Sequence, residues 1–163
     1  MSDETYGPTI TPGALALRIA QDHVGVKETP PGSNRGPKVD DYLRSAGLDP
    51  EGGSYPWCAA FVTFIVREVE KRLGKLQFAG SASVASLLKR NRSLEIHAPC
   101  EGCVFIHLRD DGKGHCGFVT RVNGDWSMAT IEGNTDSSGS RTGGQVMHQH
   151  RASGYATTFL RVG

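Results

Sequence analysis

The segment that decides the fold of this chain is YPWCAAFVTFIVREV, residues 55–69. Its apolar side chains recur at the three- and four-residue spacing of a buried helical face. They are Cys58, Phe61, Val62, Ile65 and Val69. Charged residues cover the opposite side, and Gly74 is a helix stop signal. We therefore predict a buried helix that begins at Cys58.

Three more helices are predicted around this one. Thr11-Pro12 is an N-cap followed by a first-turn proline, which starts a helix that runs to about His23. Pro37 opens a second helix with one apolar stripe, and a shorter helix is expected over 83–91. We expect residues 1–12 to be a tail and residues 13–163 to form a single catalytic domain.

From Cys103 onward the hydrophobic period changes to two, which is typical of strands. The predicted strands cover residues 103–108, 115–122, 126–132, 145–151 and 155–162. Asp-Gly at 111–112 and Asn-Gly at 123–124 are strong hairpin-turn signals. Helices followed by antiparallel strands predict an α+β fold, in which N-terminal helices pack on a C-terminal antiparallel β-sheet.

The overall composition excludes several classes of function. The net charge is only +1, so we expect no nucleic acid partner. The longest apolar run, around residues 59–66, is too short to span a bilayer, so we expect no membrane insertion. The first eleven residues lack the basic start and apolar core of a secretory signal, which predicts synthesis in the cytoplasm. An extracytoplasmic substrate would then require delivery by another system.

Cys58 is a candidate nucleophile because it lies at the predicted start of a helix. A thiol must ionise to react, and the unpaired N–H groups and macrodipole of a helix N-terminus lower its pKa. The same N–H groups can donate to the oxyanion of an acyl-transfer reaction. The alternative is a cysteine that only packs in the core.

The strands supply a candidate base, His115. If Asn123-Gly124 is a two-residue turn, His115 lies opposite Glu132, with Cβ atoms about 4.5–5.5 Å apart, and Asn134 follows diagonally on the same face. An imidazole between a thiol and an acceptor that orients it is what cysteine catalysis requires. The alternative is a surface cross-strand pair, and a longer turn would shift the register. On this register Cys116 points to the opposite face and packs in the core.

Three ordered blocks of the sequence resemble the CHAP domain, a family of cysteine, histidine-dependent amidohydrolases and peptidases. They are YPWCAAFV at 55–62, GHCGFV at 114–119 and IEGNT at 131–135. The resemblance covers about residues 25–162 and implies a papain-like fold. The chain departs from the family at PCEGC, residues 99–103, where Pro-Gly-Asp is usual, and at Cys116, where an aliphatic residue is common.

The resemblance implies a peptidoglycan hydrolase of phage or bacterial type that needs no cofactor. The bond would be the N-acetylmuramoyl-L-alanine amide or an amide of the stem peptide. Cys58 would be the nucleophile, His115 the general base, Glu132 the residue that orients it, and Asn134 an accessory polar group. The protein would act in the periplasm or cell wall as a lysin or an antibacterial effector, in the second case with a cognate immunity protein.

Two other functions remain open at this stage. One is a cysteine acyltransferase or peptidase with a protein substrate, and the other is a thiol- or metal-binding module. Cys100 and Cys103 have zinc-ligand spacing, but a disulfide or two ordinary thiols are the alternatives, and no metal site is predicted. His148 and His150 share a strand face and could hold a metal or simply be exposed.

Three loop residues near Cys58 are candidate substrate-binding residues. They are Asn34, Tyr55 and Trp57. For Trp57, aromatic packing under the helix is the alternative.

Overall fold

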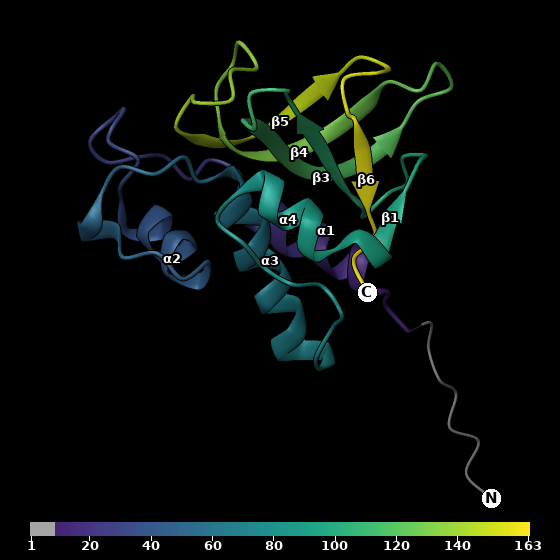
Figure 1. The fold of residues 1–163 in the computed structure, drawn as a ribbon, viewed down its shortest axis with the longest axis horizontal. Helices are drawn as coiled ribbons and strands as arrows, with labels where there is room; N and C mark the ends of the chain where they lie inside the picture. Colours follow the sequence, from purple (N-terminus) through teal and green to yellow (C-terminus); the bar gives the residue numbers. More distant parts are fainter. Residues whose placement is uncertain (1–8) are drawn as a thin grey trace, which may run out of the picture.

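The computed structural model describes residues 9–163 and shows helices packed against one antiparallel sheet (Figure 1). Residues 1–8 of the predicted tail lie outside the described part. The helices are α1 (Pro12–Asp22), α2 (Pro37–Ser45), α3 (Cys58–Leu73) and α4 (Val84–Arg90), with short 3-10 turns at Pro50–Gly52 and Arg92–Leu94. The predicted α+β class is confirmed.

All pairs of neighbouring strands in the six-stranded sheet are antiparallel. The strands are β1 (Glu95–Ile96), β2 (Val104–Leu108), β3 (Gly114–Val122), β4 (Met128–Thr135), β5 (Gln145–Arg151) and β6 (Thr158–Leu160). Their order is β1-β6-β2-β3-β4-β5, so the C-terminal strand β6 inserts between the first two. The sequence did not predict β1, because two residues carry no detectable period.

The helix starts follow from local chemistry. Thr11 caps α1 by accepting a hydrogen bond from the backbone N–H of Ala14 at 3.2 Å. Ser83 caps α4 in the same way. In contrast, no side chain caps α3, which begins at Cys58 after Trp57. The first N–H groups of α3 therefore remain available.

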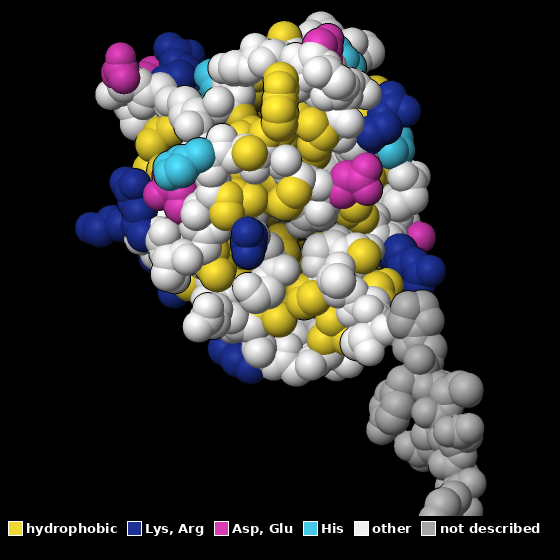
Figure 2. All heavy atoms as spheres, turned by 90° about the vertical axis from the view of Figure 1, so that its right-hand side faces the viewer, with side chains coloured by type: hydrophobic (Ala, Val, Ile, Leu, Met, Phe, Trp, Pro, Cys, Tyr) yellow, Lys and Arg dark blue, Asp and Glu magenta, His cyan; other side chains and the backbone are white. Residues whose placement is uncertain are grey.

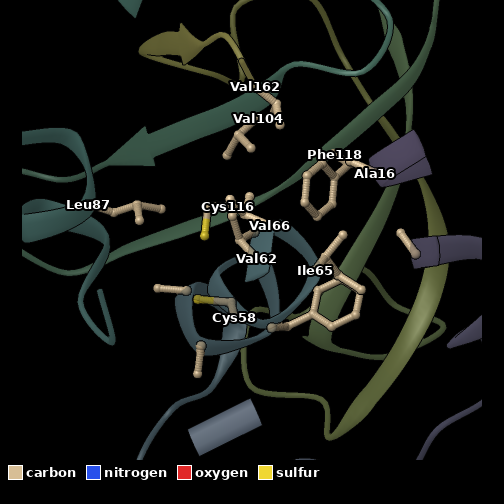
Figure 3. Packing of buried hydrophobic residues seen from close by; sticks show 14 of the residues in the cluster. Ala16, Cys58, Val62, Ile65, Val66, Leu87, Val104, Cys116, Phe118 and Val162 are labelled. Atoms are coloured by element: carbon tan, nitrogen blue, oxygen red, sulfur yellow. The ribbon is translucent and has the colours of Figure 1, made fainter. Parts of the chain in front are cut away.

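The main hydrophobic core lies between the helices and the sheet. α3 contributes most of one side, including Phe61, Val62 and Ile65, all fully buried. Figure 3 shows this core in close-up, with Cys58 on α3 and Cys116 on β3 among its members. A smaller second cluster, built on Cys103, Phe105, Val119, Met128 and Phe159, covers the other face of the sheet.

One outer face of the molecule is seen in Figure 2, which looks at the right-hand side of Figure 1. Hydrophobic side chains gather in its middle, and cationic and anionic side chains are scattered around them. Among the described helices, none has the length and apolar character needed to cross a membrane.

The predicted register of the β3–β4 hairpin is wrong. Phe118, not Cys116, pairs with Ile131, so the strands are displaced by two residues. The cause is a longer turn, in which the N–H of Asn123 donates to the carbonyl of Ser127 at 2.9 Å and Trp126 adopts a positive φ of 65°. Asp125 fixes this turn by accepting hydrogen bonds from the N–H and hydroxyl of Ser127 at 3.0 and 2.6 Å.

A bulge preserves the faces of the two strands. The pairing shifts by one residue between Val119 and Arg121. Because the net displacement is two, each residue keeps the face that was predicted for it. The strand pairing ends at Phe118 and Ile131, so His115, three residues before Phe118, and Glu132, directly after Ile131, are not opposite each other.

Candidate active site

The site forms where the N-terminus of α3 meets the start of β3. Cys58 is the first residue of α3 and only 4% of its surface is exposed. It borders a cleft of about 450 Å³ between the loop before α3, the start of α4 and the turns that carry Lys113 and Arg141. A substrate in this cleft can reach the thiol, while the rest of the cysteine is packed in the core.

His115 is the second residue of β3, and its side chain is fully buried. Its Nε2 donates to Oε2 of Glu132 at 2.7 Å. Its Nδ1 makes no well-aligned hydrogen bond within the described part of the chain. This nitrogen is the one left for Cys58, whose thiol is close enough to form a hydrogen bond and change the pKa of the ring.

Cys58 and His115 therefore stabilise each other's charged forms. The neighbouring Cys116 thiol and His115 ring outweigh burial and hold the pKa of Cys58 well below its usual value. Burial alone would lower the pKa of His115, but Cys58 and Glu132 raise that pKa to about 9. Both shifts favour the form of the pair in which Cys58 is a thiolate and His115 an imidazolium.

Cys116 takes part in this electrostatic arrangement, a role that the sequence did not predict. It packs in the core as expected, next to Cys58 (Figure 3). Its thiol is a hydrogen-bond partner of the Cys58 sulfur, and the neighbouring thiolate and burial raise the pKa of Cys116 well above its usual value. This shift favours the protonated thiol at Cys116, beside the Cys58 sulfur.

Glu132 is the acceptor for His115, although it lies diagonally across the hairpin and not opposite. Its carboxylate is fully buried. Burial would raise its pKa, but hydrogen bonds from Arg151 and His115 lower that pKa to about 2. Thr130 also donates to this carboxylate, at 2.7 Å from Oε1.

Gly117 makes the diagonal contact possible. A Cβ at this position would lie 2.7 Å from the carbonyl oxygen of Ile131 and 2.9 Å from Cγ of Glu132. The side chain of Glu132 occupies the space that any other residue at 117 would fill. Because Gly117 has no side chain, the side chains of His115 and Glu132 can come into contact above it.

Asn134 lies two residues after Glu132, but its side chain forms no hydrogen bond with the described residues. It is fully buried and has a positive φ of 57°, a conformation that asparagine tolerates. Neither polar atom of its side chain has a hydrogen-bond partner in residues 9–163. A buried amide without partners is costly, so this group is available to a ligand or a water molecule.

The three predicted substrate-binding residues differ in their surroundings. Tyr55 is half-buried beside the core. Asn34 joins two loops by donating to the hydroxyl of Ser54 at 2.9 Å. Trp57 is fully buried and donates to Glu28 at 2.8 Å, so the prediction that it lines a groove is wrong and it packs under the helix instead.

The other cysteines and histidines do not converge. Cys103 is buried, with its pKa raised to about 12 by that burial, and its sulfur accepts from the N–H of the exposed Cys100 at 3.3 Å. His148 and His150 are exposed on β5. Within residues 9–163 no three His, Cys, Asp or Glu side chains are grouped so that they could hold a metal ion.

Sequence reasoning missed Arg151, the main cation beside Glu132. It lies at the end of β5, and its guanidinium donates to both oxygens of the Glu132 carboxylate. The sequence shows Arg151 only as an arginine at the end of a strand with alternating polarity. Arginines are common at such positions on exposed sheet faces, so the pattern does not indicate a buried ion pair. The contact depends on the pairing of β4 with β5, which crosses a long loop.

A cysteine at a helix N-terminus, paired with a histidine that a carboxylate holds, is the arrangement that cysteine-dependent acyl transfer requires. Comparison with known families agrees: the chain belongs to the CHAP domain family, whose model matches residues 50–134, just over half of the chain. Members of this family are typically cysteine, histidine-dependent amidohydrolases or peptidases, which indicates a function of the peptidoglycan hydrolase or peptidase type. No curated protein and no solved structure matches the chain.

Proposed function

We propose that this chain hydrolyses an amide bond of bacterial peptidoglycan through a thioester on Cys58. The observation that carries the proposal is the buried pair of Cys58 and His115, which favour each other's charged forms, with Cys58 bordering an open cleft. Such a pair is ready to attack a carbonyl without a separate deprotonation step. The CHAP family provides the substrate class.

The reaction divides into two acyl transfers. The Cys58 thiolate attacks the amide carbon, and the uncapped N–H groups at the start of α3 stabilise the oxyanion. Protonated His115 then gives its proton to the leaving amine, and the C–N bond breaks. In the second half, neutral His115 takes a proton from water, and the hydroxide releases the acyl group as a carboxylic acid.

The cleft favours an acidic peptide as the acyl or amine part of the substrate. Lys113 and Arg141 both line it, beside Cys58. Peptide stems that carry free carboxylates would be attracted to these cations. Both the N-acetylmuramoyl-L-alanine amide and an amide within the stem peptide fulfil this condition.

We further propose that the protein reaches its substrate in the periplasm or cell wall as a lysin or an antibacterial effector. A cognate immunity protein would be its partner in the second case. Co-expression of the active protein in the periplasm with candidate neighbours of its gene tests the effector role. Lysis that no neighbouring gene product suppresses would favour a lysin.

Purified peptidoglycan sacculi test the hydrolase proposal. Wild-type protein should release soluble fragments, and mass spectrometry of their ends identifies the cleaved bond. Cys58→Ala and His115→Ala should each lose at least about 10³-fold in rate, since the two residues act as a unit. The exposed-thiol variant Cys100→Ser is the matched control and should keep full activity.

Two results would contradict the proposal. Equal release by wild type and Cys58→Ala would mean that Cys58 is not the nucleophile. Intact sacculi, together with acyl transfer from or cleavage of a protein substrate, would favour the acyltransferase or peptidase function instead.

A further inference from the structure

Glu132 has an unusually complete set of partners for a buried carboxylate. Oε1 accepts from Thr130 at 2.7 Å and from Nε of Arg151 at 2.8 Å. Oε2 accepts from His115 at 2.7 Å and from Nη2 of Arg151. Arg151 is therefore bound to the carboxylate by both oxygens, and it shares Oε2 with the imidazole.

Arg151 is itself held in place by two further contacts. Its Nη1 donates to the carbonyl of Gly139 at 3.0 Å, in the loop between β4 and β5. Its guanidinium lies over the ring of Tyr155, with 4.5 Å between Cζ and the ring centroid. That ring stacks on His107, with 4.4 Å between centroids and 11° between planes. Only 10% of the Arg151 side chain is exposed.

The charge of His115 changes during the proposed reaction, but the charge of Arg151 does not. When His115 gives its proton to the leaving amine, the buried Glu132 loses one of its two cationic neighbours. Without a second cation, burial would favour protonation of the carboxylate or its movement away from the ring. A guanidinium remains protonated at all working pH values.

We propose that Arg151 is a positioning residue that keeps Glu132 ionised and directed at Nε2 of His115 through both protonation states of the imidazole. This inference rests on the proposed function and adds a residue to its machinery. Arg151 has no contact with the cleft that borders Cys58. Its effect on the reaction passes through Glu132.

The test measures the alkylation of Cys58 by iodoacetamide as a function of pH, with Cys100→Ser as the common background. This readout needs no substrate, so it stands even if the protein does not cleave peptidoglycan. In Arg151→Met the pH at which the thiolate is lost should rise by about one unit or more, because a neutral Glu132 no longer supports the imidazolium. Arg151→Lys keeps the charge without the two-pronged contact and should give an intermediate shift.

Arg121→Met is the matched control. Arg121 is an exposed arginine on β3 that forms no ion pair among the described residues. This variant loses the same charge from the same sheet. Its alkylation profile should equal that of the background protein.

A double-mutant cycle separates positioning from simple structural support. If Arg151 acts through Glu132, then Glu132→Gln with Arg151→Met should show the same alkylation profile as Glu132→Gln alone. The double variant also removes both buried charges, so it protects the test if Arg151→Met fails to fold. Circular dichroism identifies which variants are folded.

Two outcomes would overturn the inference. One is an Arg151→Met variant in which the alkylation rate of Cys58 falls at the same acidic pH as in the background protein. The other is a double variant whose shift is the sum of the two single shifts. A third outcome is that the wild-type protein does not cleave sacculi but Arg151→Met still shows the expected alkylation shift. That outcome would count against the proposed substrate and would support the positioning role.

Discussion

At the scale of single residues, the chemistry depends on which groups surround one sulfur atom. A cysteine at a helix start is common and usually inert. Here Cys58 has the imidazolium of His115 and the thiol of Cys116 as neighbours, and both favour its ionised form. The helix N-terminus adds to this effect but does not act alone.

The Cys58–His115 pair should determine the pH range of the proposed reaction. Because the pKa of His115 is about 9, hydrolysis should decline as pH rises through about 9, where the imidazolium that protonates the leaving amine is lost. Alkylation of Cys58 should not decline there, since the thiolate remains. Measuring both rates from pH 4 to 11 checks this. A joint decline near pH 7 would show that the pair is not charged as described.

Cys116 should tune the pKa of Cys58. In Cys116→Val, which restores the aliphatic residue common in the family, the thiolate loses a donor in a dry environment, and the pKa of Cys58 should rise by about one unit. The acid limb of the alkylation profile reports this shift directly. Cys100→Ser removes a thiol that is remote from the pair and should leave the limb unchanged. An acid limb that stays in place in Cys116→Val would show that the Cys116 thiol does not donate.

At the scale of secondary-structure elements, the β3–β4 hairpin carries two of the three central residues of the site, His115 and Glu132, while Cys58 lies on α3. Its long turn and its bulge change the register by amounts that leave the faces intact. His115 and Glu132 consequently share a face, as the shorter predicted turn also required. The actual contact is diagonal and depends on the small residue Gly117.

Gly117→Ala tests this element. The added methyl group would sit within 3 Å of Glu132 and of the Ile131 carbonyl, so Glu132 must move away from His115. We expect at least a tenfold loss in cleavage rate and a destabilisation of about 1–3 kcal/mol. Thermal unfolding and sacculus assays measure the two effects.

Gly124→Ala is the control for this substitution. Gly124 belongs to the same hairpin, has open space around its Cβ position, and does not require a positive φ. It should fold and react as the wild type does. Full activity in Gly117→Ala would mean that Glu132 tolerates displacement.

At the scale of the whole molecule, a charged network lies within the packed protein. Glu132 connects β3, β4 and β5, because His115, Thr130 and Arg151 all bond to it. Its pKa is about 2 in the folded protein and 4.5 for the free side chain. The folded state therefore binds fewer protons than the unfolded state between these values.

This linkage predicts acid sensitivity. The stability that Glu132 contributes is fully present above about pH 4.5 and is lost as pH falls toward 2, amounting to roughly 3 kcal/mol. Urea unfolding at pH 6 and at pH 3 should show a larger drop for wild type than for Glu132→Gln. Equal drops would place the acid-sensitive groups elsewhere. Other carboxylates contribute equally to both proteins and cancel in the comparison.

The sequence alone determined the fold class and the order of helices and strands along the chain. Apolar periods of 3.6 and 2 record which face of each element is buried, so the helices, most strands and the placement of Cys58 at a helix start were predictable. The alternation of side chains between the two faces of a strand is a local property. His115 and Glu132 were therefore placed on one face in spite of the wrong turn.

Only the tertiary structure decided which groups meet. The burial of Trp57, the sulfur contact of Cys116 and the hydrogen bonds of Arg151 to Glu132 all join segments that are separate in the chain. Such contacts depend on packing distances and desolvation, which a periodic pattern does not encode. The candidate nucleophile can therefore be proposed from the sequence, whereas the electrostatic environment around its sulfur arises only on folding.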